Sequence, residues 1–361
     1  MQDRDGPDRE VEDLSVLLPP LLQALEALGF VARYLNPPDL PQLVAAAGDP
    51  DIALAAARPA LSAWPAALDD VRTRLETAAD AVATAFAELR LAAETGDLGQ
   101  AYRALRHAPR ADEALYPLAQ GLPPLSRYFL PPGGRGDEGL LAALAAAPAS
   151  PETGVFHIDN ERGARGGVSL YVPETYDPAT PAPLVVALHG GSGHGRAFLW
   201  SWLRDARAHG AILISPTAGG GTWALTGSDV DSPHLAHLVA QVSGRWNVDP
   251  RRRLLTGMSD GGTFAYVSGL DAASPFTHLA PVAAAFHPLL AQFADAGRLA
   301  GLPIHIAHGA LDWMFPIAMA HEARDALAAA GAQVTFREIA DLSHTYPREL
   351  NGEILDWLDG R

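Results

Sequence analysis

The second half of the chain alternates short apolar runs with amphipathic stretches, and this pattern restricts the fold more than any other feature. From about Thr153, runs such as PLVVALHG and AILISPT end at Gly or Pro, as buried parallel strands do. A helical pattern, RAFLWSWLRDARAHG, separates these two runs. The later runs RRLLTGMS, HLAPVAAAF, LPIHIAHG and QVTFREIA are spaced by helical stretches such as 317–330, and GGVSLYVPETY alternates as an antiparallel strand does. The pattern predicts an α/β fold, with a mostly parallel sheet and helices on both faces.

The first half of the chain has a helical pattern instead. Residues 1–120 are rich in Ala, Leu and Arg, and shorter helical patterns cover 20–34 and 98–107. In the segment 64–96, apolar residues recur at threes and fours, namely Leu68, Val71, Leu75, Ala78, Val82 and Leu89. We therefore expect a smaller all-α accessory domain over 1–120, acting as a cap or as a contact for a homo-oligomer.

A Pro- and Gly-rich segment, GLPPLSRYFLPPGGRGDEG, joins the two patterns and predicts a linker. A short helical pattern follows it over 140–147. The expected order is thus the accessory domain over 1–120, the linker with its short helix over 121–152, and the α/β domain over 153–361.

Composition excludes several kinds of site and partner. The chain has 361 residues, a formal net charge of −16, no cysteine and no lysine, which excludes thiolate zinc sites, cysteine nucleophiles and Schiff-base lysines. The negative charge argues against a nucleic-acid partner. The N-terminal MQDRDGPDREVEDL is unlike a signal peptide, and no apolar run approaches the roughly 20 residues that span a bilayer. We expect a cytoplasmic protein without a membrane span.

A serine lies between glycines in LLTGMSDGG, at a predicted strand-to-helix corner. Gly257-Met258-Ser259-Asp260-Gly261 matches G-x-S-x-G, where a tight turn presents the serine hydroxyl above the carboxyl end of a sheet. The alternative is a plain Gly-rich turn, which is common in a chain with 34 glycines. The strand-like RRLLTG and the helix-like GGTFAYVSGL on either side favour a nucleophile.

A serine nucleophile needs a base and an acid that orients the base. Asp312 follows the apolar run LPIHIAHG, and His344 follows the next one, QVTFREIA. The order Ser259, Asp312, His344, each in a loop after successive strands, is the order of this type of fold. Asp341 is the alternative acid, since it lies three residues before His344. We place Asp312 ahead of it because Asp312 directly follows a strand.

Two other histidines are assigned no role in catalysis. His308 lies at a strand end and is expected to be structural. His321 begins HEARD, but Asp325 stands where a zinc helix of the H-E-x-x-H type needs its second histidine. We expect no metal and no cofactor.

The loop LHGGSGHG, 188–195, follows the predicted third strand and is the expected source of an oxyanion hole. We assign its donors to the backbone N–H groups of Gly191 and Asp260. A dinucleotide-binding loop is the competing interpretation, and its spacing fails because Arg196 stands at the third glycine position when the motif starts at Gly191. Trp223, Trp313 and Phe315 lie in nearby loops and could line an apolar substrate cleft or pack in the core.

Taken together, LHGGSGHG, GMSDGG, HGALDWMFP and LSHTYP resemble the α/β-hydrolase superfamily. LYVPETYDPATPAPLVVALHGG and NVDPRRRLLTGMSDGG are similar to its branch of feruloyl esterase-like, polyhydroxybutyrate depolymerase-like and phospholipase/carboxylesterase-type proteins. The resemblance covers roughly 153–361. It implies Ser259 as nucleophile, His344 as base, Asp312 as orienting acid and Gly191 as first oxyanion donor.

The expected function is hydrolysis of small carboxylic esters, with short acyl or aromatic groups, through an acyl-enzyme. A serine peptidase or amidase is the alternative, because the same three residues support it. A third hypothesis, from another class, is a hydrolase fold that only binds a partner. The acyl and alcohol preferences stay open.

Overall fold

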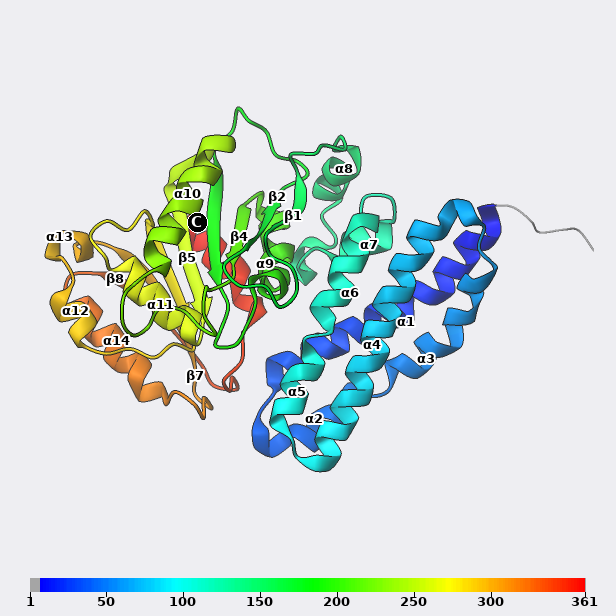
Figure 1. Ribbon diagram of the computed structural model, residues 1–361, viewed down its shortest axis with the longest axis horizontal. Helices are drawn as coiled ribbons and strands as arrows, with labels where there is room; N and C mark the ends of the chain where they lie inside the picture. The colour runs from blue at the N-terminus through cyan, green and yellow to red at the C-terminus, as the bar shows by residue number, and fades with distance from the viewer. Residues whose placement is uncertain (1–6, 361) are drawn as a thin grey trace, which may run out of the picture. The chain divides into compact units, whose positions relative to one another are not determined.

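The computed structural model describes residues 7–360, which divide into two compact units at Phe129/Leu130. Figure 1 shows the helical first unit in blue to cyan and the second unit in green to red. Residues 121–129, which the sequence places in a linker, belong to the first unit, where Leu125 and Tyr128 are buried. The hydroxyl of Tyr128 donates to the buried carboxylate of Asp112 at 2.7 Å, so this segment is held by packing and by a hydrogen bond.

The first unit is made of helices. Its α-helices are α1 (Pro7–Tyr34), α2 (Leu40–Ala47), α3 (Pro50–Ala57), α4 (Asp69–Thr95), α5 (Leu98–Leu105), α6 (Ala108–Leu115) and α7 (Pro123–Tyr128). Helix α4 follows the predicted stripe: Leu75, Val82 and Leu89 are buried, and Gly96 ends the helix in the left-handed conformation. Its N–H donates to the carbonyl of Ala92, as a C-terminal cap does.

Helix α1 is longer than the pattern over 20–34 predicts, because it begins at Pro7 and continues through Pro19 and Pro20. Each proline removes a helical hydrogen bond, which normally interrupts a helix. Leu17, Leu21 and Leu28 are buried along this helix, and apolar burial of that kind offsets the lost bonds.

One helix of the described chain, over Arg9–Tyr34, passes a length and hydropathy test for crossing a membrane. Buried core helices of soluble proteins pass the same test, and 39% of the tested window is buried.

The second unit alternates strands with helices, as the sequence predicts. Its strands are β1 (Gly154–Ile158), β2 (Val168–Val172), β3 (Ala182–Leu188), β4 (Ile212–Pro216), β5 (Val248–Met258), β6 (His278–Val282), β7 (Pro303–Gly309) and β8 (Gln333–Ile339). Its α-helices are α8 (Glu138–Ala146), α9 (Gly195–His209), α10 (Asp231–Arg245), α11 (Asp260–Gly269), α12 (Leu289–Phe293), α13 (Ala296–Leu299), α14 (Ile317–Ala329) and α15 (Asn351–Leu358).

All eight strands form one sheet in the order β1-β2-β4-β3-β5-β6-β7-β8. The pairs β1–β2 and β2–β4 are antiparallel and the remaining pairs are parallel, so the predicted early antiparallel strand is confirmed as β2. Strand β3 is buried along its whole length, as expected of a central parallel strand.

The chain reverses its direction across the sheet after β3. It passes through α9 to β4 on one side, and then through α10 to β5 on the other side of β3. Right-handed crossovers therefore place α9 on one face and α10, α11 and α14 on the opposite face, and α15 packs against α9. The carboxyl ends of β3 and β5 adjoin at this reversal, where α/β sheets bind their ligands.

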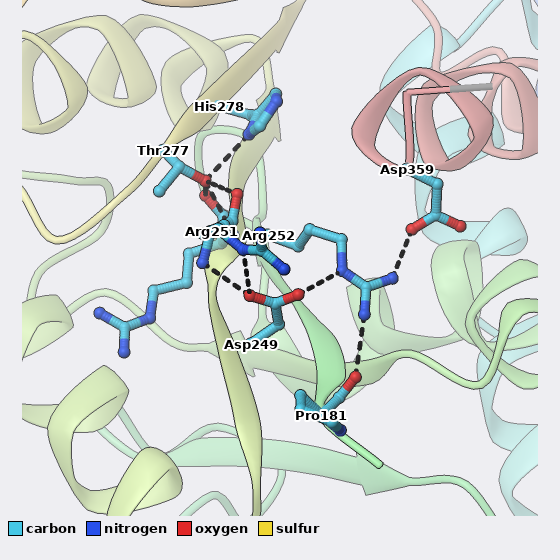
Figure 2. Close-up of polar contacts among 8 residues, drawn as sticks. Pro181, Asp249, Arg251, Arg252, Thr277, His278 and Asp359 are labelled. Carbon is cyan, nitrogen blue, oxygen red and sulfur yellow. Dashed lines mark hydrogen bonds and ion pairs between the residues drawn. The ribbon is translucent and has the colours of Figure 1, made fainter.

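An ion-pair network lies at the other end of the strands, near the starts of β3 and β5 (Figure 2). The Arg252 guanidinium donates to Asp249 at 2.8 Å, to Asp359 at 2.7 Å and to the carbonyl of Pro181 at 2.9 Å. It joins the starts of β3 and β5 to the end of α15. A surface hollow of about 660 Å³ lies beside it, lined by Arg251 and Trp357 among others.

We expect Arg252→Ala to lower the free energy of unfolding by about 2 kcal/mol, because it removes the 2.8 Å ion pair of the buried Asp249 carboxylate. Asp249 keeps the backbone N–H of Arg251 and a longer ion pair, at 3.6 Å, with the exposed Arg251 guanidinium. Urea denaturation measures the change. Arg251→Ala is the matched control, since that side chain is 89% exposed, and we expect it to change stability by less than about 0.5 kcal/mol. Equal losses in both variants would contradict this account of Arg252.

Candidate active site

Ser259 lies in a strained turn between β5 and α11. Its φ of +57° and ψ of −121° form a conformation that residues with a side chain rarely adopt. The glycines around it have no room for a side chain: a Cβ at Gly257 would lie 2.5 Å from the backbone of Gly261, and one at Gly262 would lie 2.8 Å from the carbonyl of Gly257. A Cβ at Gly261 would meet the carbonyl of Leu188. The glycines of this motif therefore allow the close approach of β3, β5 and α11 that presents the serine.

The three predicted residues meet at the carboxyl edge of the sheet. Ser259 Oγ lies 3.0 Å from His344 Nε2, and His344 Nδ1 lies 2.9 Å from Asp312 Oδ2. All three residues are buried, with Ser259 8% exposed. A carboxylate oxygen can only accept, so Nδ1 carries the ring proton and Nε2 is left to accept from the serine hydroxyl. This arrangement suits proton transfer from the serine to the histidine.

Asp312 is held in its ionised form by its partners. Burial raises its pKa, but the hydrogen bonds from His344 and from the backbone N–H of Phe315, together with the charges of His344 and His308, outweigh burial and lower the pKa below its usual value. Oδ1 accepts from the N–H groups of Met314 at 2.9 Å and of Phe315 at 2.8 Å. The loop after β7 is thus folded around the carboxylate.

Of the two candidate acids, Asp312 accepts a hydrogen bond from His344, whereas Asp341 is an exposed loop residue. His308 is buried, and its Nε2 lies 2.8 Å from the carbonyl of Phe315 and 3.4 Å from Asp312 Oδ2. Burial lowers the pKa of His308. It therefore braces the loop of Asp312, in agreement with the structural role predicted for it.

The loop after β3 lies against the nucleophile turn. Among the described residues, the N–H groups of Gly191 and Asp260 have no protein acceptor, and for Asp260 this is usual because it is the first residue of α11. Ser192 follows Gly191 with a φ of +55° and donates its N–H to Gly221 at 2.9 Å.

His189 and Trp223 support this loop from inside. His189 Nδ1 donates to Gly190 at 2.7 Å, and Nε2 accepts the N–H of Ala218 at 3.1 Å, so the ring is neutral. Burial lowers its pKa to about 4. The Trp223 indole N–H donates to the carbonyl of His189 at 2.7 Å, and its ring stacks on Phe264.

Of the two roles considered for Trp223, cleft lining or core packing, the structure supports core packing, because its side chain is 2% exposed and belongs to the core. Its indole packs against the loop after β3 through its bond to His189.

Trp313 and Phe315 lie beside His344. The Phe315 ring contacts the imidazole edge-on at 5.2 Å between centroids, and the Trp313 ring lies 6.3 Å away. Trp313 is 46% exposed, which leaves apolar surface next to the histidine.

The segment between β1 and β2 also contacts the loop after β3, and sequence patterns did not identify it. Arg165 donates to the carbonyl of Gly193 at 2.7 Å, and His194 Nε2 donates to the carbonyl of Ala164 at 3.0 Å. Only the antiparallel pairing of β2 with β4 brings this segment to the carboxyl edge, so no local signal could reveal it.

In the described part of the chain, no three or more His, Cys, Asp or Glu side chains form a group that could hold a metal ion. His321, of the rejected HEARD motif, lies 2.9 Å from Glu338.

Sequence comparison finds esterases among known proteins. The chain is 28% identical over 125 residues to the bifunctional acetylxylan esterase/xylanase XynS20E of Neocallimastix patriciarum, which covers 34% of this chain and 18% of that protein. It is 31% identical over 114 residues to feruloyl esterase C of Emericella nidulans, covering 30% of this chain and 42% of that protein. The chain thus spans less than half the length of these two relatives. No family model matches it.

The sheet order, the strained serine turn and these relatives agree on one fold. The chain has an α/β-hydrolase fold and resembles serine esterases.

Solved structures that resemble this chain include a truncated carbohydrate esterase from gut microbiota, at TM-score 0.49 and 14% identity, covering 59% of this chain and 98% of that one. A ferulic acid esterase has TM-score 0.47 and 16% identity, covering 56% and 96%. Likeness at this level gives no information on the substrate.

Proposed function

We propose that this α/β-hydrolase cleaves carboxylic esters through a Ser259 acyl-enzyme. The observation that carries the proposal is the hydrogen-bonded row Ser259–His344–Asp312 on a strained turn. The esterases among its relatives support the choice of an ester substrate.

In the first half of the reaction, His344 Nε2 accepts the hydroxyl proton while Ser259 Oγ bonds to the ester carbonyl carbon. The carbonyl oxygen becomes an oxyanion, which we assign to the N–H groups of Gly191 and Asp260, and each such donor contributes about 3 kcal/mol in comparable sites. The C–O bond to the alcohol then breaks, and His344 returns the proton to the departing alcohol oxygen. The serine is left as an ester of the acid.

In the second half, a water molecule replaces the alcohol. His344 takes one of its protons as the oxygen attacks the acyl carbon, and the bond to Ser259 Oγ breaks as the proton returns to the serine. Asp312 holds the imidazole in the correct tautomer in both halves and stabilises its charged form.

We propose that Trp313 and Phe315 form the apolar side of the acyl site. Both rings lie beside His344, and Trp313 exposes apolar surface there. Short acyl and aromatic acids are the substrates that such a surface suits.

A fluorophosphonate probe and a substrate panel test the proposal. We expect one adduct, on Ser259, and faster hydrolysis of p-nitrophenyl esters than of matched p-nitroanilides. Preferential cleavage of the anilides would make the protein a peptidase or amidase. No adduct on Ser259 in folded protein would mean that the hydrolase fold only binds a partner.

We also propose that the helical unit is an accessory part of the hydrolase that forms a homo-oligomer contact. Val11 and Val16 on α1 are 64% and 60% exposed, which is apolar surface that a second copy could cover. Static light scattering on the full chain tests this, and a monomer mass at micromolar concentration would contradict it.

A further inference from the structure

The Gly-rich loop after β4, residues 217–224, is bonded to both halves of the candidate oxyanion hole. On the side of the β3 loop, Gly221 accepts the N–H of Ser192 at 2.9 Å. On the side of the nucleophile turn, the Thr222 hydroxyl donates to Asp260 Oδ2 at 2.6 Å. Three segments that are distant in sequence therefore meet at this loop.

The carboxylate of Asp260 lies directly against Gly191. A Cβ built on Gly191 would be 2.6 Å from Asp260 Oδ2, the same oxygen that accepts from Thr222. The next residue, Ser192, has a φ of +55°, a conformation that needs restraint from its surroundings. The hydrogen bond from Thr222 fixes the position of the Asp260 carboxylate. The carboxylate in turn limits how far the Gly191 peptide can move toward it.

We propose that Thr222 and Asp260, through its carboxylate, are positioning residues that hold the Gly191 peptide in register with Ser259. The inference rests on the proposed function, because it assumes that Gly191 donates to an oxyanion. Donors of this kind lower the barrier only when they are placed before the reaction. A negative carboxylate beside the hole opposes the charge of an oxyanion, so its contribution is geometric and not electrostatic.

The geometry predicts a loss in kcat and not in KM, since the oxyanion exists only after attack. We expect Thr222→Val to lower kcat about 10-fold, with KM changed less than about 2-fold, because small displacements of catalytic groups have effects of this size. Thr222→Ser keeps the hydroxyl and should stay close to wild type.

Two substitutions at Asp260 separate geometry from charge. Asp260→Ala removes the acceptor and should lower kcat as Thr222→Val does. Asp260→Asn keeps an oxygen that accepts from Thr222 and removes the charge, so we expect it to retain kcat within about 3-fold. The double variant Thr222→Val/Asp260→Ala should be no worse than either single variant, because both remove the same bond.

Kinetics on p-nitrophenyl acetate and inhibition by a boronic acid that mimics the tetrahedral intermediate give the readouts. We expect boronate affinity to fall with kcat in Thr222→Val and Asp260→Ala. Additive losses in the double variant, a change in KM alone, or an Asp260→Asn variant as impaired as Asp260→Ala would overturn the proposal. The fluorophosphonate adduct on Ser259 separates failure of the positioning role from failure of the proposed hydrolase function. If Thr222→Val forms a normal adduct and has wild-type kinetics, only the positioning role is refuted. If the wild-type protein forms no adduct, the hydrolase function is refuted.

Discussion

Ser259→Ala is expected to lower kcat for p-nitrophenyl esters by about 10⁴- to 10⁶-fold, the range found when the nucleophile of such a triad is removed. The substitution removes the atom that forms the acyl-enzyme. The substitution should leave the strained backbone of the turn unchanged, because the close packing of the surrounding glycines imposes that conformation. The measurement is kcat at saturating ester, together with loss of the fluorophosphonate adduct.

Two further experiments serve as controls for Ser259→Ala: the double variant with His344→Ala, and a substitution at a second serine. His344→Ala should cost about as much as Ser259→Ala, and the double variant should be no worse, because the two groups act as a unit. Ser228→Ala is the matched control, since Ser228 is an exposed loop serine. Residual activity above one tenth of wild type in Ser259→Ala would refute the assignment of the nucleophile.

Asp312→Asn should lower kcat by about 10³- to 10⁴-fold while the protein stays folded. The amide can still accept the N–H groups of Met314 and Phe315 through its oxygen, so the loop keeps its shape. Its NH₂ then faces His344 Nδ1 and favours the tautomer whose Nε2 carries the proton, which cannot accept from Ser259. The pKa of Asp312 is below its usual value, so the carboxylate is ionised at neutral pH in the wild type and this comparison is made there.

Asp341→Asn is the matched control for Asp312→Asn. Asp341 lies three residues before His344 in the chain, and its loop position is exposed. We expect its kcat within about 2-fold of wild type, as for most surface substitutions. If Asp341→Asn were the damaging variant and Asp312→Asn were not, the acid would have been assigned wrongly.

Much of the fold follows from local patterns. Strands β2 to β8 lie on the apolar or alternating runs identified in the sequence, and α9 and α14 coincide with helical patterns between them. Strand β1 was not predicted: its residues are only partly buried, so its apolar signal is weak. Helix α1 extends past its predicted start because burial of its leucines offsets two internal prolines.

The candidate site was predictable for a related reason. In a parallel sheet, the loops after successive strands share one edge, so the order Ser259, Asp312, His344 already implied proximity. The supporting residues were not predictable in this way. Arg165 reaches the oxyanion loop from the β1–β2 segment, and Thr222 reaches Asp260 from the loop after β4.

The type of fold, the turn at Ser259 and the three residues that meet there could be predicted from the sequence, because periodicity, glycine spacing and strand order are local properties of the chain. The bond between Asp312 and His344, the burial of Trp223 and the contact of Thr222 with Asp260 could be established only from the folded structure. These outcomes depend on distances between side chains far apart in sequence, which are set by how the loops pack on the finished sheet.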